Sequence, residues 1–306
     1  MKNRIILIII YFIFTGCTIT PLIARGNINS KITILDQRSL IFLDRNGIPF
    51  EGISDLTYDK KRHRLYMIGD RGYFYSFYAK FNRKIEKLKY LNAFHIKALN
   101  GKVIHPDIEG LTHNNRDELI ASFERYPRVK KITKDGRLVI NYKIPKKLQN
   151  RHIYRSRNSM LEAVAYHPKY GILIASEYPI NRQKNINQTI YSLNGKEWHF
   201  KAQSYPNSAI TALEVMDDGN ILVLERAYKG LTYPIYITLK KVYLNRCDRY
   251  RNCKSEVLEI FNSDNGGGYN NFEGLARVGK DRYLMVSDNN GHFLLSTMLI
   301  YFKVNK

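Results

Sequence analysis

The stretch Glu109-Gly-Leu-Thr-His-Asn-Asn-Arg-Asp-Glu-Leu-Ile-Ala-Ser-Phe-Glu124 holds the pattern that decides the fold of this chain. It opens with a Glu-Gly-Leu tripeptide, passes through a polar turn, and closes with an apolar run that ends in a carboxylate. The pattern returns five times, about every fifty positions, which is typical of β-propellers and other closed arrays of short strands. The other four instances are Glu51-Gly52-Ile53 with Asp70, Glu162-Ala163-Val164 with Glu177, Thr211-Ala212-Leu213 with Glu225, and Glu273-Gly274-Leu275 with Asp288.

Each repeat reads as a β-hairpin. The apolar run of each copy, such as Ile172-Leu-Ile-Ala175, is short and bounded by turn formers, which favours a buried strand. The turn before it, such as His167-Pro-Lys-Tyr-Gly171, reverses the chain, so the Glu-Gly-Leu strand and the carboxylate-ending strand run in opposite directions. No helical period of comparable length competes, and the sequence therefore predicts an all-β protein.

The two ends of the chain set the expected number of blades. The stretches 27–43 and 293–304 are strand-like, and pairing them in one blade would close the ring and hide both edges. Added to five repeats, this pair predicts a six-bladed β-propeller, with five or seven blades as alternatives. The propeller is expected to be a single domain over residues 28–306.

The first residues have the features of an export signal. Met1-Lys-Asn-Arg4 is charged, and the apolar run from Ile5 to Phe14 is too short to span a bilayer comfortably. Cleavage before Cys17, in a sequence resembling a lipobox, would leave a lipidated cysteine that anchors the protein to the membrane. Cleavage after Ala24 would instead release a soluble protein, so the signal peptide is expected within residues 1–24. In either case we expect an exported bacterial protein, located in the periplasm or held at the inner or outer membrane as a lipoprotein.

Two cysteines remain after the signal. Cys247 and Cys253 lie six positions apart, and in an oxidising compartment the simplest expectation is a disulfide that closes a small loop.

The charge balance is strongly basic. The chain has 49 Lys and Arg against 27 Asp and Glu, a formal net charge of +22. A nucleic-acid partner is not expected, because no nucleic-acid-binding motif is present and an exported protein seldom meets nucleic acid. Anionic surfaces or a small phosphorylated or otherwise anionic substrate suit this charge, although lysines spread over solvated faces would give the same total.

The repeat marks predict where acidic side chains gather. Inner strands of a propeller run along the central channel, so equivalent strand ends meet at one mouth. Like charges at that mouth favour a bound cation, and calcium prefers such oxygen ligands. The alternative is structural, since a Glu beside Gly can accept backbone N–H groups and the Asp-Arg or Glu-Arg dipeptides can form local ion pairs. The candidate metal ligands are Glu51, Asp70, Glu109, Glu124, Glu162, Glu177, Glu225, Glu273 and Asp288.

The ordered blocks of the chain resemble the bacterial phytase-like family, whose members are described as having esterase-like activity of phytase. The resemblance extends over residues 36 to 303. The blocks are Glu51-Gly-Ile-Ser-Asp-Leu-Thr-Tyr-Asp59 with Ile68-Gly-Asp-Arg-Gly72, Asp107-Ile-Glu-Gly-Leu111 with Ser122-Phe-Glu-Arg125, Leu161-Glu-Ala-Val-Ala165 with Ala175-Ser-Glu177, Leu222-Val-Leu-Glu-Arg226, and Asn271-Phe-Glu-Gly-Leu275 with Val286-Ser-Asp-Asn-Asn290.

This resemblance implies phosphoester hydrolysis with calcium as cofactor. Metal-assisted hydrolysis would use Glu109, Glu162, Glu177, Glu273 and Asp288 as the catalytic carboxylates. Substrate phosphate would bind Arg71, Arg125 and Arg226, with Asn289 and Asn290 beside them. The fourth repeat departs from the pattern, because Thr211 stands where the others carry Glu.

Three classes of function are compatible with these residues. The first is a divalent-metal-dependent phosphoesterase. The second is a lactonase-like propeller with a single metal ion, and the third is a non-catalytic envelope propeller that binds a ligand or partner. In each case a monomer is expected.

Overall fold

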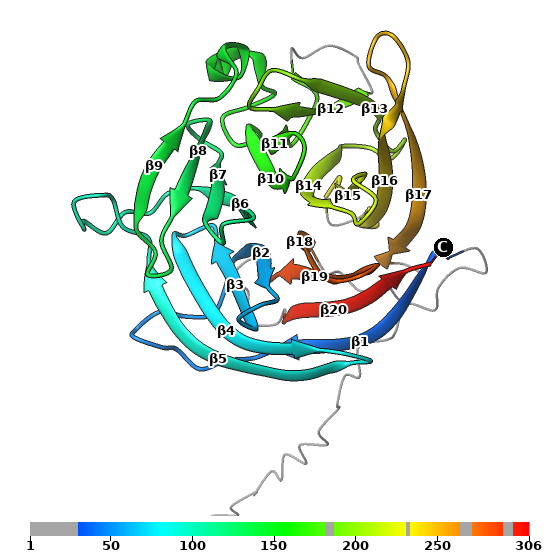
Figure 1. Ribbon diagram of the computed structural model, residues 1–306. Helices are drawn as coiled ribbons and strands as arrows, with labels where there is room; N and C mark the ends of the chain where they lie inside the picture. Colours follow the sequence, from blue (N-terminus) through cyan, green and yellow to red (C-terminus); the bar gives the residue numbers. More distant parts are fainter. Residues whose placement is uncertain (1–29, 181–186, 231–232, 264–270, 290–295, 306) are drawn as a thin grey trace, which may run out of the picture.

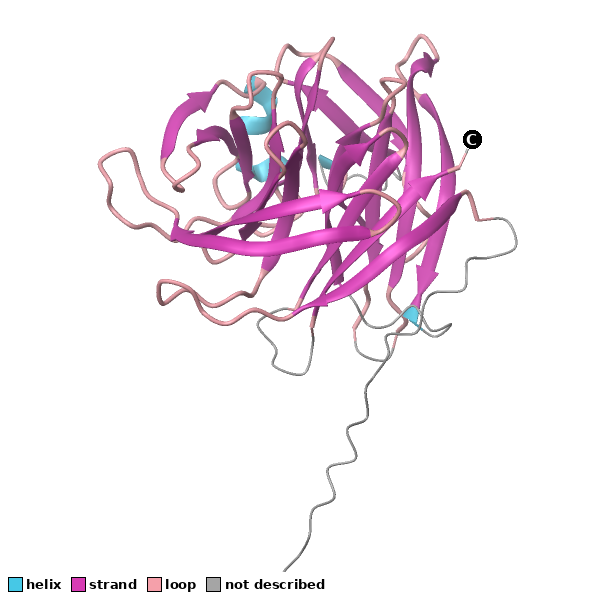
Figure 2. Ribbon diagram, turned by 60° about the horizontal axis from the view of Figure 1, so that its bottom comes forward, coloured by secondary structure: helices cyan, strands magenta, loops and turns pink. Residues whose placement is uncertain are grey.

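The fold is a five-bladed β-propeller (Figure 1). The computed structural model describes residues 30–180, 187–230, 233–263, 271–289 and 296–305. The predicted signal peptide with Cys17, and Asn290, lie outside these residues. Strands dominate the regular structure of the described chain and are joined by loops and turns, as the turned view shows (Figure 2), whereas the helical turns η1 (Lys146–Gln149) and η2 (Arg151–Ile153) are short.

Blades 1 to 3 are antiparallel four-stranded sheets that follow the order of the chain. The innermost strands of neighbouring blades contact one another around the centre. The strands are β2 (Ile53–Asp59), β3 (Arg64–Gly69), β4 (Tyr73–Phe81) and β5 (Ile85–His95) in blade 1, β6 (Ile108–His113), β7 (Leu119–Phe123), β8 (Arg128–Ile132) and β9 (Leu138–Tyr142) in blade 2, and β10 (Leu161–His167), β11 (Gly171–Ser176), β12 (Asn187–Ser192) and β13 (Glu197–Lys201) in blade 3.

Blades 4 and 5 complete the ring, and blade 5 takes one strand from the start of the chain. β1 pairs with β20 along its length, from Ile32 opposite Val304 to Leu40 opposite Thr297. The strands are β14 (Ser208–Val215), β15 (Ile221–Ala227), β16 (Tyr236–Cys247) and β17 (Cys253–Asn262) in blade 4, and β18 (Asn271–Gly279), β19 (Arg282–Asp288), β20 (Thr297–Val304) and β1 (Ile32–Leu40) in blade 5.

The prediction of six blades is wrong, although the two chain ends do pair in one blade. In the described residues the fifth repeat is followed by one more strand, β20, and a four-stranded blade needs a fourth. β1 supplies that strand, so the terminal strands complete the fifth blade instead of adding a sixth. The closure leaves β20 paired on both sides, which hides its edge from other chains.

The interior is divided into five apolar clusters, one at each interface between blades. The cluster between blades 1 and 5, for example, packs Tyr75 and Phe77 near Leu284 and Leu299. Equivalent clusters lie between blades 4 and 5, 3 and 4, 1 and 2, and 2 and 3. Because each sheet is covered on both faces, β2 is buried at every residue, including its polar residues Ser54, Asp55, Thr57 and Asp59.

Polar contacts join the blades at the mouth formed by the hairpin turns. They include ion pairs, hydrogen bonds to backbone oxygens and a tyrosine–asparagine contact. These contacts are Arg62 with Asp117 at 2.5 Å, Tyr166 with Asn115 at 3.4 Å, His167 with the Gly219 oxygen at 3.0 Å, Arg277 with Asp217 at 3.1 Å, and Arg282 with the Asn82 oxygen at 2.6 Å.

The disulfide prediction is confirmed. Cys247 and Cys253 are bonded and face each other in the register of β16 and β17, at the tip of that hairpin. Within the described residues, no helix is long and apolar enough to cross a membrane.

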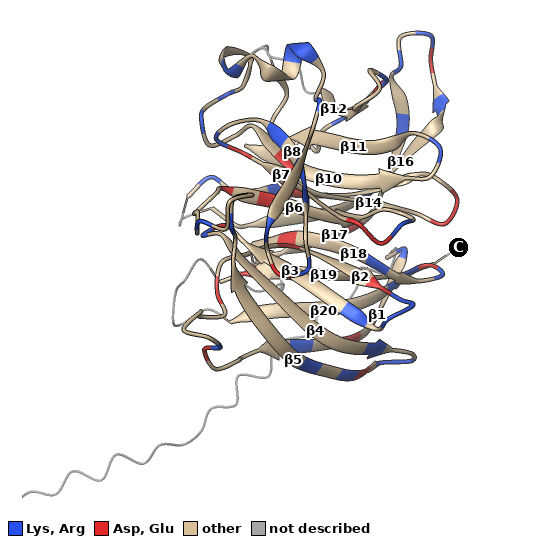
Figure 3. Ribbon diagram, turned by 60° about the vertical axis from the view of Figure 1, so that its left-hand side comes forward, with Lys and Arg blue, Asp and Glu red and all other residues tan. Residues whose placement is uncertain are grey.

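Basic side chains are distributed over loops and outer strands, as Figure 3 shows for one side of the molecule. β5, the outer strand of blade 1, carries exposed Lys87 and Lys89. Lysine on such an edge opposes pairing with another chain, as the sequence suggested.

Candidate functional site

Each innermost strand contains a β-bulge at the same place. In β2 the register passes from Ile53 opposite Gly69 to Asp55 opposite Ile68, which leaves Ser54 as the extra residue. The same shift occurs in the other four innermost strands. A bulge breaks the alternation of side chains and redirects the extra residue. The extra residues are Ser54, Glu109, Glu162, Thr211 and Glu273.

The same register identifies the equivalent residues at the ends of the second strands. The residues opposite the start of each bulge are Gly69, Phe123, Ser176, Glu225 and Ser287. The next residue in each blade is the one that ends the apolar run. These end residues are Asp70, Glu124, Glu177, Arg226 and Asp288.

Two candidate ligands from the sequence do not belong to these equivalent positions. Glu225 lies one residue before the end position of blade 4, and its carboxylate bonds the ammonium group of Lys240 at 2.9 Å with both side chains buried. Glu51 lies three residues before the bulge of blade 1 and pairs with Arg71 at 2.5 Å. Both carboxylates form ion pairs, although neither pair lies within the Asp-Arg or Glu-Arg dipeptides that the structural alternative named.

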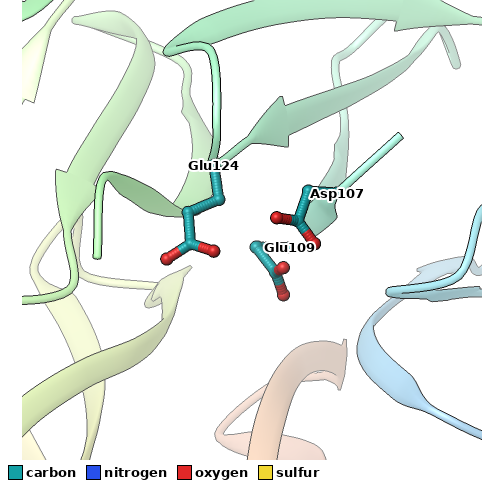
Figure 4. Close-up of side chains that lie close together, drawn as sticks. All are labelled: Asp107, Glu109 and Glu124. Carbon is teal, nitrogen blue, oxygen red and sulfur yellow. The ribbon is translucent and has the colours of Figure 1, made fainter. Parts of the chain in front are cut away.

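Carboxylates of blades 2 and 3 form two overlapping triads, each of which is close enough to hold a cation. Ligand oxygens of Asp107, Glu109 and Glu124 lie within 4.8 Å of one another (Figure 4), and so do those of Glu124, Glu162 and Glu177. Glu124 belongs to both triads. We call these five residues the carboxylate cluster.

Burial and mutual repulsion raise the pKa values of Glu109, Glu124 and Glu162. Burial raises the pKa of Glu124 to about 8, and Glu177 and Asp107 add to the rise. The pKa values of Glu109 and Glu162 are well above the usual range, mainly because both are buried and secondly because other carboxylates surround them. Such a site favours any cation that replaces the protons.

Arg226 neutralises the other part of the ring. One guanidinium nitrogen lies 2.6 Å from Glu273 and 2.5 Å from the Asn271 side-chain oxygen, and the other lies 3.5 Å from Glu177. Burial raises the pKa of Glu273 to about 7, with Arg226 opposing the rise and Asp288 adding to it. Arg226 therefore acts as an internal counterion, and these contacts occupy the guanidinium that the sequence offered for substrate phosphate.

Blades 1 and 5 supply polar groups on the remaining side. Within the described residues, Ser54 Oγ and Asp70 Oδ1 are buried without a hydrogen-bond partner. Burial raises the pKa of Asp70. Asn289 accepts a hydrogen bond from the Gly52 N–H at 3.1 Å, and Asp288 is buried at the end of β19.

Two predicted substrate-binding arginines lie at the mouth on the side of the carboxylates, which is opposite the mouth formed by the hairpin turns. Arg71 and Arg125 are 53% and 64% exposed, and Arg125 pairs with Asp107 at 2.8 Å. Both keep donor groups toward solvent because their carboxylate partners occupy only part of each guanidinium.

One buried aspartate follows the bulge of β2. Asp55 is 1% exposed, and its carboxylate accepts backbone N–H groups from Leu56, Leu111 and Leu275. Burial raises its pKa, and these three hydrogen bonds oppose that rise.

The sequence reasoning missed three residues of this region. Asp107, two positions before Glu109, is placed in the first triad by the start of β6. Asn271 and Asp55 were also missed. Aligning the repeats on the ends of the apolar runs, rather than on the Glu-Gly-Leu tripeptides, would have exchanged Glu225 for Arg226. It would not have matched Asp55 with Gly110, because that equivalence appears only in the strand register.

A comparison with protein families identifies this chain. The family described as phytase-like, esterase-like activity of phytase, matches residues 48–291. The chain belongs to the phytase-like family. At the level of the family, this phytase-like protein is therefore grouped with esterase-like hydrolases.

Solved structures similar to the phytase-like chain have low identity. The Pan2 WD40 domain of Neurospora crassa is 11% identical, with a TM-score of 0.35 over 90% of this chain and 96% of that one. A luciferin-regenerating enzyme is 9% identical, with a TM-score of 0.43 over 83% and 92%. The aldose sugar dehydrogenase of Streptomyces coelicolor is 8% identical, with a TM-score of 0.39 over 92% and 98%. No curated protein matches the phytase-like chain.

Proposed function

We propose that this phytase-like propeller is an exported phosphoric ester hydrolase that uses one divalent cation, calcium, bound by the carboxylate cluster between blades 2 and 3. The observation that carries the proposal is the pair of triads sharing Glu124. The substrate class is a small phosphorylated molecule, for which the family description suggests phytate as the first candidate.

The residues of the cluster fit a hard cation. All of their ligand atoms are carboxylate oxygens, which calcium prefers. In the described part of the chain, no Lys, Arg or His forms an ion pair with Glu109, Glu124 or Glu162. The repulsion among these three side chains is therefore opposed only by arginines that pair with other carboxylates, Arg125 with Asp107 and Arg226 with Glu177.

Arg226 favours one ion over several. It pairs with Glu177, which belongs to the cluster, and with Glu273 of blade 5. A second divalent ion there would face a fixed guanidinium charge. The predicted ligands Asp70, Glu273 and Asp288 are consequently assigned to the wall of the site.

The protein's own side chains have distinct parts in this proposal. Calcium, when bound, would polarise the phosphate and lower the pKa of a bound water. Arg71 and Arg125 hold the anionic substrate at the mouth through charge-assisted hydrogen bonds. Burial of the cluster strengthens its electrostatic interactions, because the low local dielectric reduces screening.

The test is a metal and activity assay on protein without its signal peptide. Calcium binding is measured by calorimetry, and release of phosphate is followed from phytate and from phosphomonoesters, with calcium or with chelator. Glu124→Gln removes a charge from both triads and should abolish tight binding and turnover. Glu118→Gln is the matched control, because Glu118 pairs with Lys131 beside the turn at the far end of β6.

Several outcomes contradict the proposal. Turnover that persists in chelator, or in Glu124→Gln with its fold intact, excludes this metal site. Calcium binding without phosphate release from any ester, in an assay that also includes lactones, would leave a lactonase or a binding propeller according to whether lactones are opened.

A further inference from the structure

At the position that follows the bulge, one of the five innermost strands carries a charged side chain. In the register of the five hairpins, Asp55 is equivalent to Gly110, Ala163, Ala212 and Gly274. Four blades therefore supply a small residue, and blade 1 alone supplies a carboxylate. Asp55 is buried at this position.

Asp55 connects three innermost strands. One carboxylate oxygen accepts the N–H of Leu111 in β6 at 2.7 Å, and the other accepts the N–H groups of Leu275 in β18 at 3.1 Å and of Leu56 at 2.8 Å. β6 and β18 lie on either side of β2 in the ring. The innermost strands have no further strand on their channel side, so these N–H groups would lack partners without Asp55.

The two bonded leucines are each two residues from a bulged glutamate. Glu109 precedes Leu111, Glu273 precedes Leu275, and a glycine stands between in each case. A Cβ on Gly110 would lie 2.4 Å from Ser122 Oγ, and a Cβ on Gly274 would lie 2.8 Å from Asp55 Cα. The backbone between Asp55 and each glutamate is therefore closely packed, and a shift at either leucine moves the glutamate.

We propose that Asp55 is a positioning residue for the ring, which holds the β6 segment of Glu109 in place against β2 and thereby sets the affinity of the carboxylate cluster for calcium. This inference rests on the proposed function. Asp55 is not itself a ligand in this assignment, because three N–H donors already occupy its two oxygens.

The experiment compares Asp55→Asn with Asp59→Asn by calcium calorimetry. Asparagine has one acceptor oxygen, so its amide group faces at least one of the N–H groups that the carboxylate bonded. Loss of such supporting contacts typically weakens metal binding about 10- to 100-fold, and we expect a change of that size in Asp55→Asn. Asp59 is a matched control, because it is a buried carboxylate of the same strand that pairs with Arg62 at 2.9 Å at the opposite mouth. Asp59→Asn should lose stability and keep the calcium affinity of the unmodified protein.

A measurement on the unmodified protein covers the case in which Asp55→Asn does not fold. Calcium should slow hydrogen exchange of the amides in peptides that contain Leu111 and Leu275, because the ring and the Asp55 contacts are mechanically linked. Unchanged exchange there, or an Asp55→Asn protein that binds calcium as tightly as the control, overturns the inference. Absence of calcium binding by the unmodified protein instead overturns the proposed function, so the two failures are distinct.

Discussion

Arg226 stands where the other four blades carry Asp70, Glu124, Glu177 or Asp288. This one difference divides the ring into a side that the protein neutralises itself and a side where the carboxylates repel one another. It also raises the pKa of the Arg226 guanidinium: burial alone would lower that pKa, but Glu273, Glu177 and Glu162 outweigh it. Because blade 4 carries Arg226 in place of a carboxylate, the proposed ion is confined to blades 2 and 3.

Arg226→Leu should destabilise the protein strongly at pH 8. Removing one partner of a buried ion pair leaves uncompensated charge and typically costs about 3–5 kcal/mol. The free energy of unfolding in urea measures this loss. Arg125→Leu breaks a pair that is largely exposed and should cost less than about 1 kcal/mol. Similar losses in both variants would show that Arg226 is not a buried counterion.

The shared bulge is the element that builds the site. It redirects Glu109, Glu162 and Glu273 at the same place in three innermost strands, beside small residues that let the strands approach closely. Gly110 illustrates this requirement, since its neighbours include the backbone nitrogen of Val164 and the backbone oxygen of Glu162 in the adjacent blade. In the Glu-Gly-Leu pattern, the glycine thus allows close packing of the strands and the glutamate supplies the side chain of the candidate site.

Gly110→Ala should lower stability and weaken calcium binding together. An added Cβ would lie 2.8 Å from Val164 N and 2.9 Å from Glu162 O, so blades 2 and 3 must separate slightly. Overpacking of this kind typically costs about 1–3 kcal/mol. Thermal unfolding and calorimetry measure the two effects. Gly279→Ala is the control, because the nearest atoms to its added Cβ lie at 3.9 Å, and a loss there equal to that of Gly110→Ala would contradict this explanation.

The disulfide acts on a different element and should affect only stability. It closes a short loop at the tip of the β16–β17 hairpin. Replacing both cysteines by serine should cost about 2 kcal/mol, because a short closed loop restricts the unfolded chain modestly. Unfolding in urea under non-reducing conditions measures the loss, and calcium affinity should be unchanged. A changed calcium affinity would mean that the hairpin tip is coupled to the channel mouth.

At the scale of the whole molecule, closure by β1 holds five blades in a ring and brings their carboxylates to one axis. Each blade interface has its own apolar cluster. This packing offsets the cost of gathering like charges in a buried site. The site is thus electrostatically unfavourable without a cation, and its stability should depend on pH.

Without calcium, stability should fall as pH rises from about 4.5 to about 8. Folding raises the pKa of Glu124 from 4.5 to about 8 and that of Glu273 from 4.5 to about 7, so the folded state binds more protons than the unfolded state in this window. Thermal unfolding across this range measures the slope. Calcium at about one hundred times its dissociation constant should increase the free energy of unfolding at pH 8 by about 2.7 kcal/mol, because it binds the folded state.

Glu124→Gln supplies the check on this pH dependence. The substitution removes one of the carboxyl groups whose pKa folding raises, so the fall in stability with rising pH should become shallower. A calcium-free protein that gains stability between pH 5 and pH 8 would contradict the assignment of protonated carboxylates to the ring.

The sequence by itself determined the all-β class, the five repeats, the disulfide and the gathering of Glu109, Glu124, Glu162 and Glu177, because strand period and turn chemistry are local properties. It did not determine the number of blades, since the fourth strand of blade 5 comes from the other end of the chain. Nor did it determine the register, because in a strand a shift of one residue exchanges the two faces. Only the tertiary structure therefore decided that Glu225 pairs with Lys240, that Arg226 enters the ring, and that Asp55 bonds the innermost strands of the two neighbouring blades.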